Sequence, residues 1–386
     1  MLAVITDDFT GASEIAGIAL AKGYRTVIET KVTEEPDADV IVIATNMRSL
    51  DRDRAASKSA AVTREVLALK PDLIFKKVDS VLRGNVGSEL EAQMAVENKA
   101  AALLVPANPS RHRTIADGVY FVDDKPVAES GFGSARYGSS GTSHVVDILR
   151  NSGASSASSV SLGDPIEIGG VQVGNAVSGA DMSGWAGRVS DKLVPAGAAD
   201  FFAALLDTRT ADAALNGAEA DIAGPSRRLY LCGSGFPSSR EAVMAARAQG
   251  GRAVEMPDEV YFSDDPRQFM LDRWASDVIA ALSESDRVIV AALQSPGDNS
   301  LSPQQITLAM AEVARQAVAN GAVDELLIEG GATSQAVIAA LDIERLYPSQ
   351  SLAPGVTRMR VDNYPGLHIT MKPGSYRWPA EIWDFN

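Results

Sequence analysis

Short apolar runs alternate with longer stretches of helical periodicity along this chain, and this alternation constrains its fold more than any other feature. In the first half, the apolar runs are each interpreted as a buried strand and cover residues 2–6, 26–29, 40–45, 73–76 and 102–105. Helical spacing separates them at residues 11–21, 51–69 and 87–96. Apolar strands separated by helices are typical of a parallel sheet with helices on both faces.

The second half shows the same alternation after a stretch with Gly, Pro and many Ala residues at 207–228, which we interpret as a crossing between domains. Strands are predicted at residues 228–232, 252–256, 287–293, 325–329 and 368–372. Helices are predicted at residues 238–248, 267–283, 303–320 and 334–341. The sequence therefore predicts an α/β fold of two three-layer domains with mostly parallel sheets, residues 1–215 and 216–386. We expect the active site in the cleft between these domains.

The middle of the chain changes in composition. Residues 130–142 and 151–163 are rich in Gly, Ser and Ala. Such clusters of small and polar residues predict flexible loops, here on either side of a helix at residues 145–150. A further helix is predicted at residues 198–206, close to the end of the first domain.

Composition excludes several classes of protein. Lys and Arg total 35 and Asp and Glu total 50, so the formal net charge is −15 and the chain repels nucleic acids and anionic membranes. The single cysteine, Cys232, rules out an intrachain disulfide and a cysteine metal cluster. The N-terminus lacks a secretory signal pattern, and no apolar run approaches the roughly 18 residues of a membrane span. We expect a cytoplasmic protein, with a homodimer as the commonest oligomeric state.

Ligands of open parallel sheets bind beyond the carboxyl ends of the strands, so polar residues directly after each predicted strand are candidates for a site. The first strand is followed by T-D-D-F-T-G at residues 6–11. The adjacent carboxylates of Asp7 and Asp8 are able to bind Mg²⁺, to orient hydroxyls or to act as a base. Capping of the next helix needs only one such residue, so the pair favours a functional role.

A second polar cluster, K-K-V-D-S-V-L-R-G-N at residues 76–85, follows the strand at residues 73–76. Its two lysines and one arginine, in an acidic chain, indicate a local site for a small anion. The alternative is a solvated loop, but the density of charge at a strand end favours the anion site. The run R-H-R at residues 111–113 leaves two interpretations open, an extension of this basic site or a surface loop.

Three glycine-containing turns follow strands of the second domain: C-G-S-G-F-P-S-S at residues 232–239, E-G-G-A-T-S at 329–334 and K-P-G-S at 372–375. Backbone N–H groups in such turns are able to approach a phosphate at a helix N-terminus. Glycines in strand–helix turns also have a purely steric explanation, but three of these turns in one domain favour a nucleotide site. The chain lacks a P-loop motif and a complete G-x-G-x-x-G, which argues against a P-loop hydrolase and a dehydrogenase.

Motifs along nearly the whole chain resemble those of one known family. ITDDFTGASEIAG is similar to the family's A-D-D-L-T-G-A-N-D, and KKVDSVLRGNVG is similar to K-K-[IV]-D-S-T-L-R-G-N-[IV]-G. PANPSRHRTIADGVYFVDDKPV resembles a P-A-x-P…G-R-T block, and LCGSGFPSSREAV, IEGGATSQAVIAAL and MKPGSYRWP resemble segments of a C-terminal nucleotide domain. On these motifs the chain resembles the four-carbon acid sugar kinases.

This resemblance implies a sugar-acid-binding N-terminal domain and a C-terminal domain that binds ATP. The implied substrate contacts are Asp7, Asp8, Lys76, Asp79, Ser80 and Arg83. The implied ATP contacts are Ser234, Gly330, Gly331, Ala332, Thr333 and Gly374. Mg²⁺ would neutralise charge on the phosphates, and no residue is assigned as its ligand.

The resulting hypothesis is ATP-dependent phosphorylation of a four-carbon acid sugar of the threonate, erythronate or 3-oxo-tetronate type. Asp8 or Asp79 would accept the proton of the attacking hydroxyl or orient it, and Arg83 with Lys76 or Lys77 would clamp the substrate carboxylate. The family has an acidic residue where this chain has Ala332. The alternative is therefore a non-catalytic protein that binds a sugar acid and a nucleotide through a degenerate ATP site.

Overall fold

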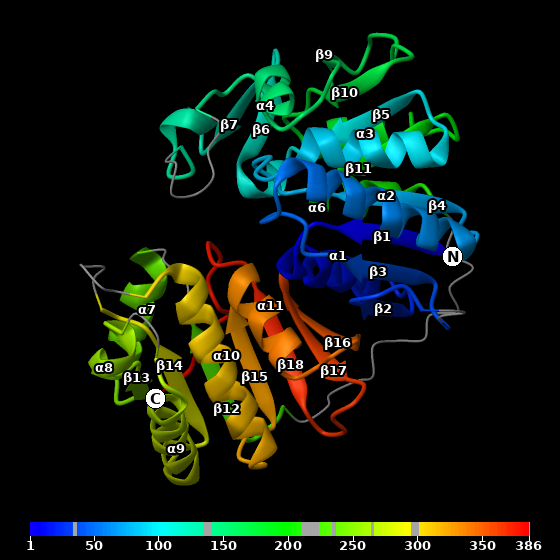
Figure 1. Ribbon diagram of the computed structural model, residues 1–386. Helices are drawn as coiled ribbons and strands as arrows, with labels where there is room; N and C mark the ends of the chain where they lie inside the picture. The colour runs from blue at the N-terminus through cyan, green and yellow to red at the C-terminus, as the bar shows by residue number, and fades with distance from the viewer. Residues whose placement is uncertain are drawn as a thin grey trace. The chain divides into compact units, whose positions relative to one another are not determined.

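The computed structural model describes residues 1–33, 37–133, 141–209, 224–233, 237–263, 266–294 and 301–385. The chain divides into two compact units, Met1–Asn216 and Gly217–Asn386. In each unit, helices pack on a mainly parallel sheet (Figure 1). The predicted crossing at residues 207–228 and the predicted loop at 130–142 lie largely outside the described residues.

The first unit has a sheet with the strand order β2-β3-β1-β4-β11-β5-β10-β9, in which neighbouring strands are parallel. These strands are β1 Leu2–Thr6, β2 Thr26–Glu29, β3 Val40–Ala44, β4 Leu73–Lys77, β5 Ala101–Val105, β9 Ala157–Val160, β10 Gly170–Gly174 and β11 Leu193–Gly197. The apolar strands β1, β3 and β5 are buried along their whole length, as expected for strands covered on both faces. β2 and β3 lie on one side of β1 in the sheet, and β4 lies on the other side. A topological switch point therefore lies beside β1.

Two groups of helices pack on this first sheet (Figure 1). The first group is α2 Arg52–Ala68, α3 Val86–Glu97 and α4 Val145–Asn151, and the second is α1 Phe9–Ala21, α5 Gly179–Ala186 and α6 Ala199–Asp207. Phe75 of β4 packs against Phe201 and Phe202 of α6, with ring centroids 5.9 and 5.2 Å away. Burial of these three aromatic side chains ties α6 to the centre of the sheet.

The structure differs from the sequence prediction in the Gly- and Ser-rich middle of the first unit. The segment predicted as a flexible loop at residues 151–163 contains β9, an edge strand parallel to β10. A small antiparallel sheet, β6 Arg113–Ala116, β7 Val119–Val122 and β8 Lys125–Pro126, was not predicted either. The short helical turns η1 Pro109–Arg111 and η2 Val127–Glu129 flank it. Small, half-buried side chains suffice on an edge strand, so the apolar signal of β9 is weak.

The second unit has the parallel strand order β13-β14-β12-β15-β18, extended by two antiparallel strands, β17 and β16. The strands are β12 Arg228–Cys232, β13 Arg252–Glu255, β14 Arg287–Ala291, β15 Glu325–Glu329, β16 Arg345–Ala353, β17 Val356–Val361 and β18 His368–Lys372. The hairpin of β16 and β17 was not predicted. The prediction of an α/β fold with mostly parallel sheets is confirmed.

Three helices of the second unit, α9 Gln268–Glu284, α10 Pro303–Ala319 and α11 Gly331–Ala340, pack side by side (Figure 1). The described residues of this unit also form α7 Pro237–Ala248 and the short α8 Asp258–Tyr261. Tyr230 of β12 is buried under Val243 of α7 and Ile382 near the C-terminus, and its hydroxyl donates to the Ile382 carbonyl at 2.6 Å. In the described part of the chain, no helix combines the length and the apolar character that a membrane crossing requires.

Candidate active site

Strands β3, β1 and β4 end side by side in the first unit. Thr6, the last residue of β1, is the register partner of both Ala44 and Lys77, the last residues of β3 and β4. The segments that follow these three strands therefore emerge at one edge of the sheet, beside the switch point. This is where open α/β sheets bind their ligands.

Asp8 occupies the position that caps α1. Its Oδ1 accepts a hydrogen bond from the Gly11 backbone N–H at 2.8 Å, and its Oδ2 accepts one from the Thr10 hydroxyl at 2.7 Å. A Cβ at position 11 would lie 2.8 Å from Asp8 Oδ1, so glycine is required for this close approach. The T-D-D-F-T-G motif thus does cap a helix, but the cap uses Asp8 alone.

Arg48, which the sequence analysis did not single out, binds both members of the aspartate pair. Its Nε and Nη2 donate to the two carboxylate oxygens of Asp7 at 2.7 and 2.9 Å, and its Nη1 donates to Asp8 Oδ2 at 2.7 Å. The same Nη1 lies 3.7 Å from Asp79 Oδ1. One guanidinium therefore links three buried carboxylates that come from two separate loops.

Asp79 is held by Arg83 in a bidentate ion pair. Arg83 Nε and Nη2 donate to the two oxygens of Asp79 at 2.8 and 2.6 Å, and the backbone N–H groups of Val81 and Arg83 donate to Oδ2. Leu82 has a φ of 60°, a rare conformation for a bulky side chain, inside this turn. The carboxylate thus organises a strained loop at the end of β4.

The three carboxylates differ in their protonation. Burial raises the pKa of Asp7 above its ordinary value, with the neighbouring Asp8 adding to the effect and Arg48 opposing it. Burial also acts on Asp8, but the charges of Arg48 and Lys77 outweigh it and lower the pKa. Likewise, Arg83 and Arg48 hold the pKa of Asp79 well below its ordinary value despite burial. Asp8 and Asp79 are therefore ionised acceptors, whereas Asp7 binds a proton more readily.

Lys76 and Lys77 point to opposite faces of the sheet, because successive side chains of a strand alternate. Lys76 Nζ is fully buried and lies 2.6 Å from Glu89 of α3. Lys77 Nζ donates to the Val78 carbonyl at 2.9 Å and lies 3.6 Å from Glu14 of α1. The structure therefore does not bring the two lysines together, and each ammonium already has a partner within the fold.

Ser80, in the loop after β4, contacts the small antiparallel sheet. Its Oγ accepts a hydrogen bond from Arg113 Nη1, and its carbonyl accepts one from the buried Tyr120 hydroxyl. The ring of Phe132 lies under two guanidinium groups, with Arg113 Cζ 5.2 Å and Arg83 Cζ 5.8 Å from its centroid. The small sheet thus adds a second arginine beside the predicted substrate loop.

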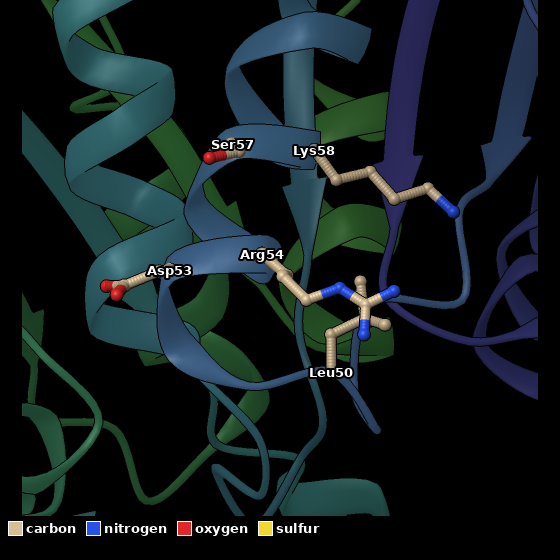
Figure 2. A pocket seen from close by; sticks show the side chains of 5 residues that line it. All are labelled: Leu50, Asp53, Arg54, Ser57 and Lys58. Atoms are coloured by element: carbon tan, nitrogen blue, oxygen red, sulfur yellow. The ribbon is translucent and has the colours of Figure 1, made fainter.

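A shallow surface pocket of about 530 Å³ lies on the first turns of α2 (Figure 2). Leu50, Asp53, Arg54, Ser57 and Lys58 line it, and Arg54 and Lys58 extend to the same side of the helix while Asp53 points away (Figure 2). None of the predicted site residues lines this pocket. Of the predicted residues, Asp7, Asp8, Asp79 and Arg83 are instead linked by the ion pairs with Arg48 and Arg83 described above.

Strands β12, β15 and β18 of the second unit also end in register. Cys232 pairs with Glu329, and Glu329 pairs with Lys372, each being the last residue of its strand. The turns that contain Gly233, Gly330 and Gly374 therefore start from one edge of the sheet. The chain passes to one side of β12 for β13 and β14 and to the other for β15, so this edge is also at a switch point.

Two glycines of this edge are required by the backbone. Gly330 has a φ of 91°, which side chains disfavour, and it directly precedes α11, whose first turn contains Gly331, Ala332 and Thr333. A Cβ on Gly233 would lie 2.6 Å from Thr333 Oγ1. Thr333 is buried and Ala332 is exposed. Ser234, the remaining predicted ATP contact, lies outside the described residues.

A buried ion pair lies directly beneath these turns. Lys372 Nζ is 3.1 Å from Glu329 Oε1 and 5.2 Å from the ring centroid of Trp378, and both charged side chains are almost fully buried. Burial lowers the pKa of Lys372, while Glu329 opposes this shift. Burial, reinforced by Glu329, raises the pKa of the Cys232 thiol, which disfavours the reactive thiolate.

The sequence contained a signal for Arg48 that was not used. The strand ending at Ala44 is followed by T-N-M-R, so the rule of polar residues after strands also applies there. Asn46 has a φ of 54°, and the Arg48 N–H donates to the Asp7 carbonyl at 3.3 Å, which folds the loop back over β1. Arg113 belongs to the run at residues 111–113, for which the sequence left open an extension of the basic site or a surface loop. Its contact with Ser80 depends on a hairpin that was not predicted.

Comparison with known proteins places the chain in a family. Residues 2–236 match a family described as a sugar-binding N-terminal domain, and residues 229–376 match one described as a nucleotide-binding C-terminal domain. A 3-oxo-tetronate kinase of Methylobacterium radiotolerans is 26% identical over 410 residues, which cover 97% of this chain and 96% of that protein. A D-threonate kinase of Bordetella bronchiseptica is 27% identical and covers 97% of this chain and 94% of its own length. A D-threonate kinase of Salmonella typhimurium is 38% identical over 135 residues, or 34% of this chain and 32% of that protein.

Two solved structures have the same fold. A Salmonella typhimurium protein superposes with a TM-score of 0.78 at 19% identity, covering 97% of this chain and 96% of its own. A Haemophilus influenzae protein superposes with a TM-score of 0.70 at 20% identity, covering 97% of both chains. The family matches extend over both units, and they agree with the resemblance found in the sequence motifs. The chain belongs to the family of four-carbon acid sugar kinases.

Proposed function

We propose that this kinase transfers the terminal phosphoryl group of ATP to a hydroxyl of a four-carbon acid sugar of the threonate, erythronate or 3-oxo-tetronate type. The observation that carries the proposal is the cluster of Asp7, Asp8 and Asp79 around Arg48, at the sheet edge where ligands bind. A polyhydroxy acid offers hydroxyl donors to ionised carboxylates and a carboxylate to arginines. Relatives named for 3-oxo-tetronate, D-threonate and D-erythronate support this substrate class.

In the proposed reaction, the substrate hydroxyl oxygen forms a bond to the γ-phosphorus while the bond from that phosphorus to the bridging oxygen of ADP breaks. The hydroxyl proton passes to a carboxylate, and ADP leaves. Asp8 is the proposed proton acceptor because its side chain is 10% exposed, against 3% for Asp7 and 6% for Asp79. Asp79, held by Arg83, orients the substrate. Asp7, with its raised pKa, is the alternative acceptor.

The second unit supplies the proposed nucleotide site. Backbone N–H groups of the turns at Gly233, Gly330 and Gly374 would hold the phosphates, and Lys372 would add a positive charge once it exchanges Glu329 for a phosphate oxygen. Among the described residues, no group of three or more His, Cys, Asp or Glu side chains is arranged to hold a metal. Magnesium that enters bound to the ATP phosphates needs only one or two protein carboxylates, and Glu329 at this edge fits that role. When bound, Mg²⁺ neutralises charge on the phosphates.

The proposed function is tested by ADP release, coupled to an optical readout, with threonate, erythronate and 3-oxo-tetronate as acceptors. The wild-type protein is expected to release ADP with at least one acid. The variant Asp8→Asn retains helix capping, because Asn caps as well as Asp, but it loses the proton acceptor and is expected to lower kcat about 10²–10⁴-fold. Arg83→Ala is expected to raise the KM for the acid.

The control Asp191→Asn alters an exposed aspartate of the same unit and is expected to keep full activity. Full activity in both Asp8→Asn and Arg83→Ala would overturn the site assignment. A loss of activity in Asp7→Asn but not in Asp8→Asn would move proton acceptance to Asp7. Binding of the acid without any ATP affinity, measured by calorimetry, would favour the non-catalytic alternative that the change at Ala332 suggests. Placement in the cytoplasm stays a sequence prediction.

A further inference from the structure

Arg113 differs from Arg48 and Arg83, at the same edge of the first sheet, in the kind of side chain that it contacts. Arg48 is neutralised by Asp7 and Asp8, and Arg83 is neutralised by Asp79. Arg113 donates instead to a neutral hydroxyl, Ser80 Oγ. Within the described parts of the chain, no carboxylate forms an ion pair with Arg113.

The position of Arg113 is fixed by its surroundings. It is the first residue of β6, and the Arg113 and Asn108 backbones hydrogen-bond to each other in both directions, at 2.7 and 3.2 Å. The Phe132 ring contacts the Arg113 guanidinium at 5.2 Å and also the guanidinium of Arg83. An aromatic ring stabilises a cation without removing its charge, so it holds Arg113 in place and leaves it able to bind an anion.

The carboxylates of this cluster contact arginines other than Arg113. Asp7, Asp8 and Asp79 form their ion pairs with Arg48 and Arg83, so none of the three binds the Arg113 guanidinium directly. A guanidinium has five N–H donors arranged as a planar fork that matches a carboxylate, and Ser80 uses one of them. Lys76 and Lys77 are poorer candidates, because each ammonium already has a partner within the fold.

We propose that Arg113 binds the carboxylate of the substrate and thereby selects four-carbon acids over neutral sugars of the same length. This inference rests on the proposed function and names the residue that reads the acid group. In this proposal Arg113, rather than Lys76 or Lys77, acts together with Arg83 to hold the substrate carboxylate. Phe132 acts as a positioning residue that keeps the guanidinium facing the substrate loop at Ser80.

The test compares binding of an acid with binding of its primary amide, which has the same hydroxyls but no negative charge. Calorimetry with threonate or erythronate measures Kd for the wild-type protein and for Arg113→Met. Arg113→Met removes charge-assisted hydrogen bonds to the carboxylate, so the acid is expected to bind about 10- to 100-fold more weakly to the variant. The amide is expected to bind the wild type and Arg113→Met with Kd values that agree within about threefold, because it lacks the carboxylate that Arg113 binds.

Two further variants complete the design. Arg113→Lys keeps the charge but loses the planar fork, so acid affinity is expected between those of wild type and Arg113→Met. Arg64→Met removes an exposed arginine of α2 and is expected to leave acid affinity unchanged. Thermal unfolding of each variant checks that the fold is retained. In a crystal structure of the wild type with the acid bound, the carboxylate is expected within about 3.2 Å of the Arg113 nitrogens.

An equal loss of acid and amide affinity in Arg113→Met would show that Arg113 only positions Ser80, and it would overturn the inference. Unchanged acid affinity, or a bound carboxylate placed away from Arg113, would overturn it as well. Failure of the proposed function gives a different result, since the wild type would then fail to bind or phosphorylate any of the acids. The two failures are therefore distinguishable.

Discussion

Removal of the Arg48 guanidinium probes the electrostatics of the first unit most directly. The substitution Arg48→Met keeps an unbranched side chain but leaves Asp7, Asp8 and Asp79 without the cation they share. The side chains of these aspartates are only 3, 10 and 6% exposed, and that of Arg48 is 22% exposed. Breaking a buried ion pair by removing one partner costs about 3–5 kcal/mol. Because water reaches Arg48, we expect a loss near the lower end, about 3 kcal/mol.

The loss is expected to depend on pH with a defined sign. In the wild type the folded-state pKa of Asp8 and Asp79 is below the ordinary value of 3.8, so their stabilisation is present above that value and is lost as pH falls further. Without Arg48, burial and mutual repulsion raise the folded-state pKa values of Asp7 and Asp8. Between about pH 8 and pH 5 the folded variant therefore binds more protons than the unfolded variant. Its free energy of unfolding rises as pH falls, so the difference from the wild type becomes smaller.

Urea unfolding followed by circular dichroism at several pH values measures this free energy. The control Arg54→Met removes an arginine whose side chain is 74% exposed and lies 3.9 Å from Asp51, so it is expected to cost less than about 1 kcal/mol. A deficit for Arg48→Met below about 1 kcal/mol, or one that grows as pH falls, would refute the proposed role of Arg48.

Three further predictions concern the second unit. Gly330→Ala forces a side chain into a φ of 91°, so we expect weaker ATP binding by calorimetry, with a loss of about 1 kcal/mol or more in the free energy of unfolding. Lys372→Met removes the cation paired with Glu329 and is expected to raise the Kd of ATP about tenfold in the same assay. Glu325→Gln leaves the buried Arg358 without its carboxylate partner, so the midpoint of urea unfolding is expected to fall, by the equivalent of about 3 kcal/mol, with ATP affinity unchanged.

Much of this architecture follows from local signals in the sequence. The apolar runs at β1, β3 and β5 are buried on both faces, and such strands are recognisable without any knowledge of their neighbours. Because parallel strands end at a common edge, a polar motif after one strand lies beside the motif after the next. The rule singled out Asp7, Asp8 and Asp79, and also Gly330 and Gly374, as candidates for a site. The structure brings the three aspartates together around Arg48 and places the two glycines after neighbouring strands.

The contacts that were missed depend on long-range geometry. Whether Lys76 or Lys77 faces the ligand side depends on the register of β4 and on which helix covers each face, which periodicity alone does not determine. Arg113 reaches Ser80 across 33 residues of sequence through an unpredicted hairpin. The pairing of β16 with β17 is similar. Most residues of β16 are only partly buried, and β17 contains Thr and Arg residues, so neither strand has a continuous apolar run.

Phosphoryl transfer from ATP to a four-carbon acid can be followed by ³¹P nuclear magnetic resonance of a reaction mixture. Purified protein, ATP, Mg²⁺ and threonate, erythronate or 3-oxo-tetronate are combined, and the phosphorus signals are followed over time. ADP and a new phosphomonoester signal are expected in equal amounts with at least one acid, and neither is expected without an acid. An unchanged ATP spectrum with every acid, or release of inorganic phosphate alone, would contradict the proposed function.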